Sequence, residues 1–566
     1  MSGKTLKFLL ATLLSMCMLG AHAIDRPDVR TPENRVVYSV YLRNYTNPEA
    51  SGTFNDLRKD LPRLKDLGID VIHLLPFYEM GVEHAKGSPY CIKDYTKVDP
   101  RYGTSEDLKA LIGDIHANGM EIWFDWVGNH TAYDHPWVKQ HPDWYTERQD
   151  FDDVRSVNSS NPELRKAMAE AMRFLVDEYG IDGYRCDFAH APGLDFWTDI
   201  IGMVDPEHKL YWLAEGDEGG IANNWVRGEG GPFDSRYGWT YSEFMYKDEF
   251  DRKDQTDAKD LNKALFHLGY PTDRATFLAY IGSHDIFQGM KPQVSANTQD
   301  FIYGDNLKPF TVMTMLAPGV PMVYMGQEIN YSKEGGVGIM TDNEAIDWTK
   351  VDEDYLALVK KLINLRHTEP ALRTLEGILI NHPTDNDSVY AFERRNGDQS
   401  MIGIVNMSYN PQTFKITSKA IPQNVYTDIF GNTATGTTLD AVLSIPAKGY
   451  SVYIKDDAPL IAEPYRITLR LPAGTGNESN PSLDIFTKDP LEIGGEIMIA
   501  EDLEMKPVAG KAGEYSAEVA YLPEFGYSMR FKNVAGGNNE LLTIYSDSPE
   551  DAIYELSEDN NLIVRK

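Results

Sequence analysis

Cysteine is scarce in this chain of 566 residues, which contains only Cys17, Cys91 and Cys186. Three thiols cannot form the framework of several disulfide bonds that stabilises small secreted proteins, and they cannot build a cysteine-rich zinc site. We expect Cys91 and Cys186 to be unpaired. The chain is therefore neither a disulfide-stapled protein nor a zinc protein of the cysteine-based kind.

Positive charge is also in short supply. Lys and Arg number 54 against 86 Asp and Glu, which leaves a formal net charge of −32. A surface this acidic repels phosphate groups, which argues against nucleic acids and anionic membranes as partners. It fits a protein that binds a neutral ligand or works outside the cytoplasm. The apolar fraction of 42% and the charged fraction of 25% are ordinary for a soluble globular protein and exclude wholesale disorder.

Long hydrophobic runs are missing beyond the N-terminus. There, two lysines precede an apolar run over residues 9–19, and a small-x-small motif ends at Ala23. This order is typical of a secretory signal peptide that is cleaved after Ala23. The run is too short to span a bilayer. We therefore expect residues 1–23 to be removed and the protein to be periplasmic or secreted, with no membrane partner.

Short apolar runs alternate with amphipathic helical segments over the first two thirds of the chain. Repeated strand–helix units predict a parallel sheet, and the number of units favours a closed (β/α)8 TIM barrel over residues 24–373. A short insertion follows the third strand at residues 131–160. Strands are predicted at 36–41, 71–76, 121–126, 183–188, 211–216, 277–283 and 320–326, with a weaker one at 233–237, and helices at 56–67, 105–118, 162–179 and 352–367.

The pattern changes to a period of two residues after the last of these helices. Two alternating runs flank Asn396-Gly397, which is a good pair for a hairpin turn. Residues 374–456 are therefore predicted to form an antiparallel β-sandwich domain. A polar, proline-containing linker follows, and residues 465–566 form a further small β-rich module. The module either packs as plain structure or binds polysaccharide through aromatic side chains; the candidates for such a surface are Tyr515, Tyr521, Phe525 and Tyr527.

Ionisable residues stand at the ends of four predicted strands, where functional groups of a barrel lie. A period of two places Arg185 and Asp187 on one face of their strand and Cys186 on the other. Burying several carboxylates is costly, but it makes sense where carboxylates divide acid and base roles across a scissile bond. We interpret Asp125, at the base of its motif, as structural. The four segments are Asp125–His130, Gly183–His190, Leu213–Asp217 and Tyr280–Asp285.

In this order the four segments resemble the conserved regions of the α-amylase family of glycoside hydrolases. Gly326-Gln327-Glu328 after the eighth strand and Gly87-Ser88-Pro89-Tyr90 in the second-strand loop add to the likeness, which covers about residues 35–456. The resemblance implies that Asp187 is the nucleophile and that Glu215 is the acid, then the base. It implies that Asp285 favours the distorted sugar ring. By the same resemblance Arg185 keeps Asp187 ionised, His130 and His284 bind hydroxyls, Tyr90 stacks beneath the ring, and His190 lines the leaving-group side.

The resemblance also raises the question of a structural calcium ion, because Asn129 stands where the family often has a calcium ligand. A second ligand is often an aspartate, but the corresponding residue here is Ser156. Serine is a poor ligand for a hard divalent cation. The loop after the first strand has Glu49 as its only acid. We therefore expect no required cofactor and no metal site; a structural calcium is the alternative.

The function that these patterns favour is a retaining glycoside hydrolase that cleaves α-glucosidic bonds in starch-type α-glucans or maltooligosaccharides. An α-glucosidase, a maltogenic enzyme or a transglycosylase on the same barrel is the alternative. A catalytically inactive glycan-binding protein is a further one, but Asp187, Glu215 and Asp285 are all present. The patterns carry no signal for an oligomeric state.

Overall fold

The computed structural model describes most of the barrel and much of the two domains that follow it. The predicted signal peptide with Cys17, the loop residue Glu49, the linker 456–464, and Tyr521 and Phe525 lie outside the described residues. Described are residues 35–46, 52–148, 150–216, 225–226, 231–239, 241–242, 245, 261–262, 265, 276–287, 304–331, 345–373, 378–417, 425–431, 437–455, 465–472, 480–488, 496–519, 527–534, 543–546, 552–556 and 562–565.

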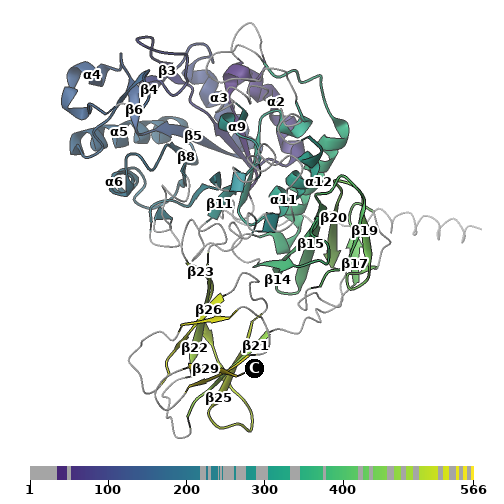
Figure 1. The fold of residues 1–566 in the computed structure, drawn as a ribbon. Coiled ribbons are helices and arrows are strands. Elements are labelled where there is room, and N and C mark those ends of the chain that lie inside the picture. The colour runs from purple at the N-terminus through teal and green to yellow at the C-terminus, as the bar shows by residue number, and fades with distance from the viewer. Residues whose placement is uncertain are drawn as a thin grey trace, which may run out of the picture.

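Eight parallel strands close into a barrel, which confirms the predicted fold class (Figure 1). The weak strand predicted near residue 235 is present and completes the closure. Going round the barrel, the strands are β1 (Val37–Val40), β12 (Val320–Tyr324), β11 (Thr276–Ala279), β10 (Ser235–Tyr237), β9 (Tyr211–Ala214), β8 (Gly183–Asp187), β5 (Glu121–Val127) and β2 (Val71–Leu74).

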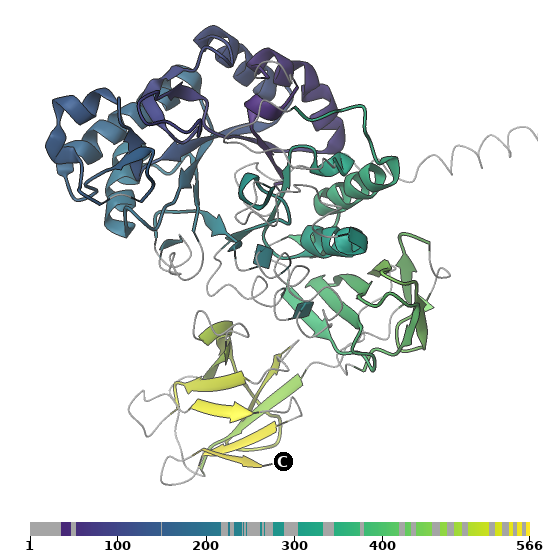
Figure 2. The ribbon, with the colours of Figure 1, turned by 45° about the horizontal axis from the view of Figure 1, so that its top comes forward.

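Helices pack around the outside of these strands (Figure 2). Their ends follow local chemistry: Thr53 and Thr104 each form a capping box with the acid three residues later, and Gly180 ends a helix in the left-handed conformation. The helices are α2 (Phe54–Leu67), α3 (Ser105–Ala117), α5 (Pro162–Tyr179), α6 (Leu194–Val204), α11 (Leu307–Leu316) and α12 (Glu353–Thr368), with short α4 (Pro136–Gln140) and α9 (His284–Phe287).

Two small antiparallel ribbons extend the loops at the C-terminal ends of the barrel strands. The first pairs β3 (Tyr78–Met80) with β4 (Ile92–Val98). The second lies in the predicted insertion and pairs β6 (His130–Ala132) with β7 (Val154–Ser156). The ribbons matter for the site because Tyr90 precedes β4 and His130 begins β6.

The domain after the barrel is a six-stranded antiparallel sheet that is buried on both faces. Tyr390 and Phe392 join the core of the barrel, whereas Val389 and Ala391 on the opposite face pack on a two-stranded ribbon. The predicted hairpin is present. The sheet contains β13 (Ile378–His382), β14 (Val389–Asn396), β15 (Gln399–Asn406), β20 (Tyr450–Lys455), β17 (Val425–Asp428) and β18 (Thr437–Thr438), and the ribbon β16 (Gln412–Phe414) and β19 (Leu443–Ile445).

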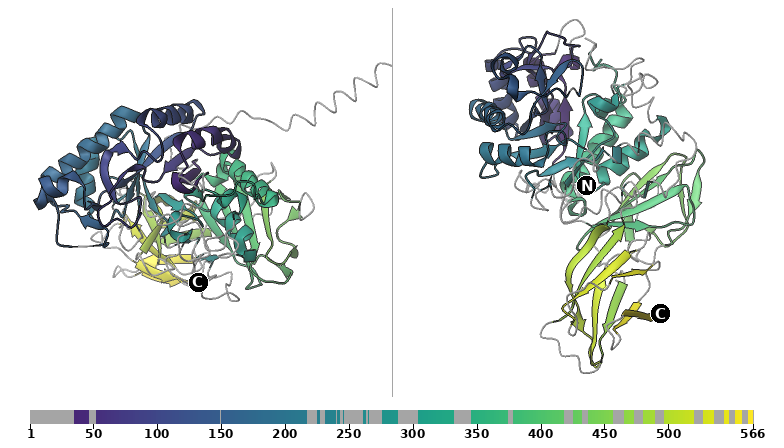
Figure 3. Two further views of the ribbon diagram at one scale, coloured as in Figure 1. Left: turned by 90° about the horizontal axis from the view of Figure 1, so that it is seen from above. Right: turned by 60° about the vertical axis from the view of Figure 1, so that its left-hand side comes forward.

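The C-terminal module consists of two sheets with a hydrophobic core of their own. Figures 1 and 3 show it set apart from the barrel. Within the ranges given above, no helix combines the length and apolar composition needed to cross a bilayer. The strands are β21 (Tyr465–Arg470), β22 (Ser482–Lys488), β23 (Glu496–Glu504), β24 (Lys506–Pro507), β25 (Glu514–Val519), β26 (Tyr527–Lys532), β27 (Thr543–Ser546), β28 (Ala552–Leu556) and β29 (Leu562–Arg565).

Candidate active site

Arg185, on β8, lies at the centre of the candidate site and is fully buried. One terminal nitrogen of its guanidinium donates to both carboxylate oxygens of Asp125, at 2.8 and 2.9 Å, and to Asp187 Oδ1 at 2.7 Å. The other terminal nitrogen contacts Glu215 Oε1. The structure thus brings the predicted nucleophile and the predicted acid onto one guanidinium. Cys186, on the other face of the strand, is a buried free thiol, as is Cys91.

Three carboxylates share this single buried cation, so they do not all ionise equally. Burial raises the pKa of Asp125, but Arg185 and the nearby His73 outweigh it and lower the pKa. Burial raises the pKa of Asp187 to about 7; Arg185 offsets part of this rise, and the charge of Asp125 adds to it. Burial likewise holds the pKa of Glu215 well above its usual range. Arg185 therefore pairs with Asp187 and lowers its pKa, as the resemblance implies, but burial outweighs this effect and leaves the Asp187 pKa raised.

Asp125 contacts several polar side chains of the barrel interior. The sequence predicted only a structural role for it. Tyr90 donates to its Oδ2 at 3.0 Å, and His73 Nε2 lies 3.7 Å from the same oxygen. The other ring nitrogen of His73 is 3.1 Å from Ser39 Oγ. His73 was not predicted as a site residue; the only signal for it is a lone polar residue inside the apolar run of β2. Together these contacts fix Asp125, and through it Arg185.

His284 and Asp285 follow β11 and reach the same cluster. His284 stacks on Tyr90, with ring centroids 5.7 Å apart, and its Nε2 is 2.9 Å from the Tyr90 hydroxyl and 3.3 Å from Asp285 Oδ2. Burial lowers the pKa of His284 and of His130 to about 4, so both rings are neutral at neutral pH. A neutral imidazole both donates and accepts a hydrogen bond, which suits the binding of hydroxyl groups.

Phe188 directly follows the nucleophile candidate and adopts a left-handed backbone conformation, with φ of 46°. Such a value is uncommon for residues other than glycine. Its backbone N–H donates to Glu215 Oε2 at 2.6 Å. The centroid of its ring lies 4.3 Å from that of the His190 ring and 5.8 Å from that of the Phe151 ring. His190 is exposed, as is 47% of Phe151, so exposed aromatic side chains lie next to the residue that binds Glu215.

Comparison with known proteins agrees with this geometry. The profile of the family described as "Alpha amylase, catalytic domain" matches residues 39–153 and 142–355, more than half of the chain. The chain belongs to the α-amylase family. The match covers the barrel strands from within β1 to β12 and every site residue described above.

Several members of the α-amylase family are similar to this chain along most of its length. A maltogenic α-amylase from Bacillus acidopullulyticus is 26% identical over 408 residues, 66% of each chain. An α-1,4-glucan:maltose-1-phosphate maltosyltransferase from Cereibacter sphaeroides is 26% identical over 427 residues, 67% of this chain and 59% of the relative. The chain spans about two thirds or less of the length of these relatives. The crystal structure of a noncanonic maltogenic α-amylase from Thermotoga neapolitana matches with a TM-score of 0.59 and 25% identity, over 76% of this chain and 98% of that one.

The residues at the position of the family's calcium site do not fit a metal ion in this α-amylase family member. Arg148 donates to Asn129 Oδ1 at 2.8 Å and pairs with Asp150 at 2.9 Å. Ser156 donates its hydroxyl to the same Asp150 oxygen at 3.0 Å. The guanidinium of Arg148 therefore already binds the oxygen atoms that a hard cation would need as ligands. Within the described ranges, no group of three or more His, Cys, Asp or Glu is arranged to hold a metal ion.

We predict that a chelator leaves the melting temperature and the activity of this protein unchanged, because Arg148 already satisfies the site. Replacing Arg148 with alanine should lower the free energy of unfolding by about 1–3 kcal/mol, since Asn129 Oδ1, which is buried, loses its donor. Thermal melts of the unmodified protein and of the Arg148 variant, with and without EDTA, measure the effects on stability. Rates with and without EDTA measure the effect on activity. A melting temperature that falls by several degrees on chelation, and recovers with calcium, contradicts the prediction.

Proposed function

We propose that this protein is a retaining glycoside hydrolase that cleaves α-glucosidic bonds through a covalent glycosyl–enzyme intermediate. The observation that carries the proposal is the arrangement of Asp187 and Glu215 on the two terminal nitrogens of Arg185. Retaining enzymes need their two carboxyl groups only about 5–5.5 Å apart, and a shared guanidinium supports such a spacing. Glu215, with its raised pKa, retains the proton that a general acid must donate.

The chemistry proceeds in two steps. Asp187 attacks the anomeric carbon, the glycosidic bond breaks, and Glu215 gives its proton to the leaving oxygen. Glu215, now a carboxylate, then takes a proton from a water molecule. The oxygen of that water attacks the anomeric carbon, and the bond between this carbon and Asp187 breaks. In this proposal Asp285, His130 and His284 hold the hydroxyl groups of the sugar at the cleavage point, and Tyr90 lies against its ring.

The substrate proposed is a starch-type α-glucan or a maltooligosaccharide, since the relatives include a maltogenic α-amylase and an α-1,4-glucan maltosyltransferase. Transfer of the glycosyl group to a sugar is the second candidate, because one relative is named a maltosyltransferase. Product analysis on soluble starch, maltoheptaose, pullulan and trehalose tests both. Hydrolysis yields shorter products, initially in the α configuration by NMR, whereas transfer yields products longer than the substrate. Early release of β-configured products contradicts the retaining mechanism.

The place of action proposed is the periplasm or the exterior of the cell. Its support is the basic, then apolar, then small-residue pattern that ends at Ala23. Expression of the full chain in a bacterium, followed by N-terminal sequencing of the exported protein, tests this. A mature protein that begins at Ile24 supports export, and an uncleaved protein that stays in the cytoplasm contradicts it.

Phe151 is proposed to bind the sugar on the leaving-group side. It packs on Phe188, whose N–H holds Glu215, and Glu215 must face the leaving oxygen. We predict that Phe151→Ala lowers kcat/KM on maltoheptaose by about 2- to 12-fold, which corresponds to ~0.5–1.5 kcal/mol of aromatic contact. An aryl maltoside, which lacks the sugar beyond the cleaved bond, should be little affected. Phe174→Ala, at an exposed position on α5, is the matched control; equal losses on both substrates contradict the assignment.

The pH dependence of kcat/KM tests the shared protonation of the cluster. Activity requires Asp187 ionised and Glu215 protonated, so the acid limb should have its midpoint near the Asp187 pKa of about 7. The charge of Asp125 raises that pKa. We therefore predict that Asp125→Asn moves the acid limb to lower pH by about one unit, with a reduced maximal rate. A thermal melt checks that the variant is folded. A limb that stays in place or moves to higher pH contradicts the prediction.

A further inference from the structure

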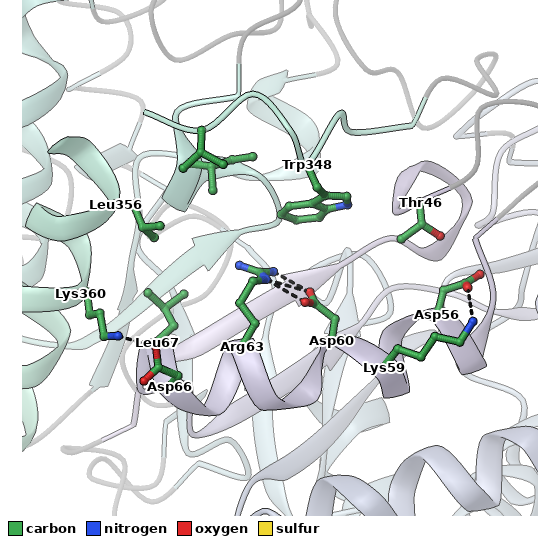
Figure 4. A pocket seen from close by; sticks show the side chains of 12 residues that line it. Thr46, Asp56, Lys59, Asp60, Arg63, Asp66, Leu67, Trp348, Leu356 and Lys360 are labelled. Carbon is green, nitrogen blue, oxygen red and sulfur yellow. Dashed lines mark hydrogen bonds and ion pairs between the residues drawn. The ribbon is translucent and has the colours of Figure 1, made fainter. Parts of the chain in front are cut away.

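A cavity of about 410 Å³ lies on the outside of the barrel, between α2, α12 and the loop that contains Trp348 (Figure 4). Its volume falls within the range of about 300–1,000 Å³ that is usual for small-molecule sites. None of its lining residues belongs to the catalytic cluster. They are Thr46, Asp56, Lys59, Asp60, Arg63, Asp66, Leu67, Ile329, Trp348, Val351, Leu356 and Lys360.

The charged side chains that line this cavity are paired with one another. Three acids face three bases, and each acid pairs with one base, as the dashed lines of Figure 4 show. Arg63 is also paired with the buried Glu328, so four acids surround three bases; no base is left free to attract an anion, and a neutral ligand fits the cavity better. The pairs are Lys59 with Asp56 at 3.2 Å, Arg63 with Asp60 at 2.7 Å, and Lys360 with Asp66.

One side of the cavity is formed by apolar side chains and is held in place. The indole N–H of Trp348 donates to the backbone oxygen of Tyr45 at 2.6 Å, and the guanidinium of Arg63 lies 4.6 Å from the indole centroid. Arg63 is fixed in turn by Glu328, which is fully buried, at 2.7 Å. Because these groups are already ordered, a ligand has little ordering entropy to overcome on binding. Leu356 and Val351 complete the apolar surface.

We propose that this cavity is a second glycan-binding site that takes a glucosyl segment of the polymeric substrate. Sugar rings are neutral, carry apolar C–H faces that suit Val351 and Leu356, and carry hydroxyl groups that suit paired charges such as Lys360 and Asp66. The inference rests on the proposed function for the identity of the glycan. A polymer attached both here and at the catalytic mouth is held at a higher effective concentration, whereas a short oligosaccharide cannot reach both sites.

The test uses substitutions that fill the cavity with a larger side chain. In the full-length protein, Leu356→Trp adds bulk from a partly exposed position on α12, and Val351→Trp does so from the facing loop. We expect either change to weaken retardation in starch-containing native gels and to raise KM on soluble starch roughly tenfold, below the 10²–10⁴-fold that linked sites can reach. The rate on maltotriose should not change. Phe174→Trp, at an exposed position on α5, is the matched control.

The outcomes separate this proposal from the proposed function. Loss of starch retardation with an intact maltotriose rate supports the cavity as a glycan site. Unchanged retardation and unchanged KM in both folded variants, or equal losses in Phe174→Trp, overturn it. Absence of hydrolysis of every α-glucan by the unmodified protein would instead overturn the proposed function, while the gels still report whether the cavity binds starch.

Discussion

Replacing Asp187 with asparagine should reduce kcat by at least about 10⁴-fold on every α-glucoside, because no covalent intermediate can form without the carboxylate. The change is nearly isosteric, and the amide oxygen can still accept the hydrogen bond from Arg185. The fold should therefore persist. Steady-state rates on starch and on an aryl maltoside measure the loss, and mass spectrometry with a slow fluorinated substrate looks for the glycosyl–enzyme ester.

Asp195→Asn is the matched control for this variant, since Asp195 is exposed at the start of α6. It should leave the rate and the trapped ester unchanged. A residual activity in Asp187→Asn above about one tenth of the original, or an ester trapped on another residue, means that the nucleophile lies elsewhere.

Replacing Glu215 with glutamine should reduce kcat by about 10²–10⁴-fold on maltooligosaccharides, the usual contribution of a general acid. The loss depends on the leaving group. A nitrophenolate leaves without a proton, so the first step should be nearly normal on an aryl maltoside, and the ester should accumulate because no base then activates water. Burst kinetics distinguish this pattern from a simple loss of binding.

Glu170→Gln, at an exposed position on α5, controls for the chemical change alone. Added azide serves as a second check, because a nucleophile that needs no base should rescue the second step in Glu215→Gln. Equal losses on activated and unactivated substrates, with no burst and no rescue, contradict the assignment of Glu215 as the acid.

Much of the fold was predictable because its signals are local. The strand at Gly183–Asp187 and the helix at Pro162–Tyr179 were evident from an apolar run, a cap at Asn161 and a stop at Gly180. The strand at Ser235–Tyr237 gave only a weak signal, since three residues are too few for a pattern; its existence follows from barrel closure. The hairpin around Asn396-Gly397 was clear from its turn, but burial of both faces of its sheet was not, because that depends on the barrel beside it.

In the candidate site, too, some residues were predictable from local signals and others were not. Asp187, Glu215 and Asp285 were found from motifs at strand ends, and Arg185 was placed beside Asp187 by the period of the strand. The central position of Asp125 was missed. That role comes from contacts with three other elements, which no spacing along the chain reveals. Arg148 was missed for the same reason, because it meets Asn129 only after the insertion folds back on the barrel.

The sequence by itself determined the barrel, the order of the domains and the identity of the catalytic candidates, because strand period, helix caps and strand-end motifs act over a few residues. Only the tertiary structure decided the protonation of the cluster. Asp125, Asp187 and Glu215 come from β5, β8 and the end of β9, and their charges act on one another only where the closed barrel buries them around Arg185. Electrostatic energy depends on distance and burial in space, and both arise when the strands close.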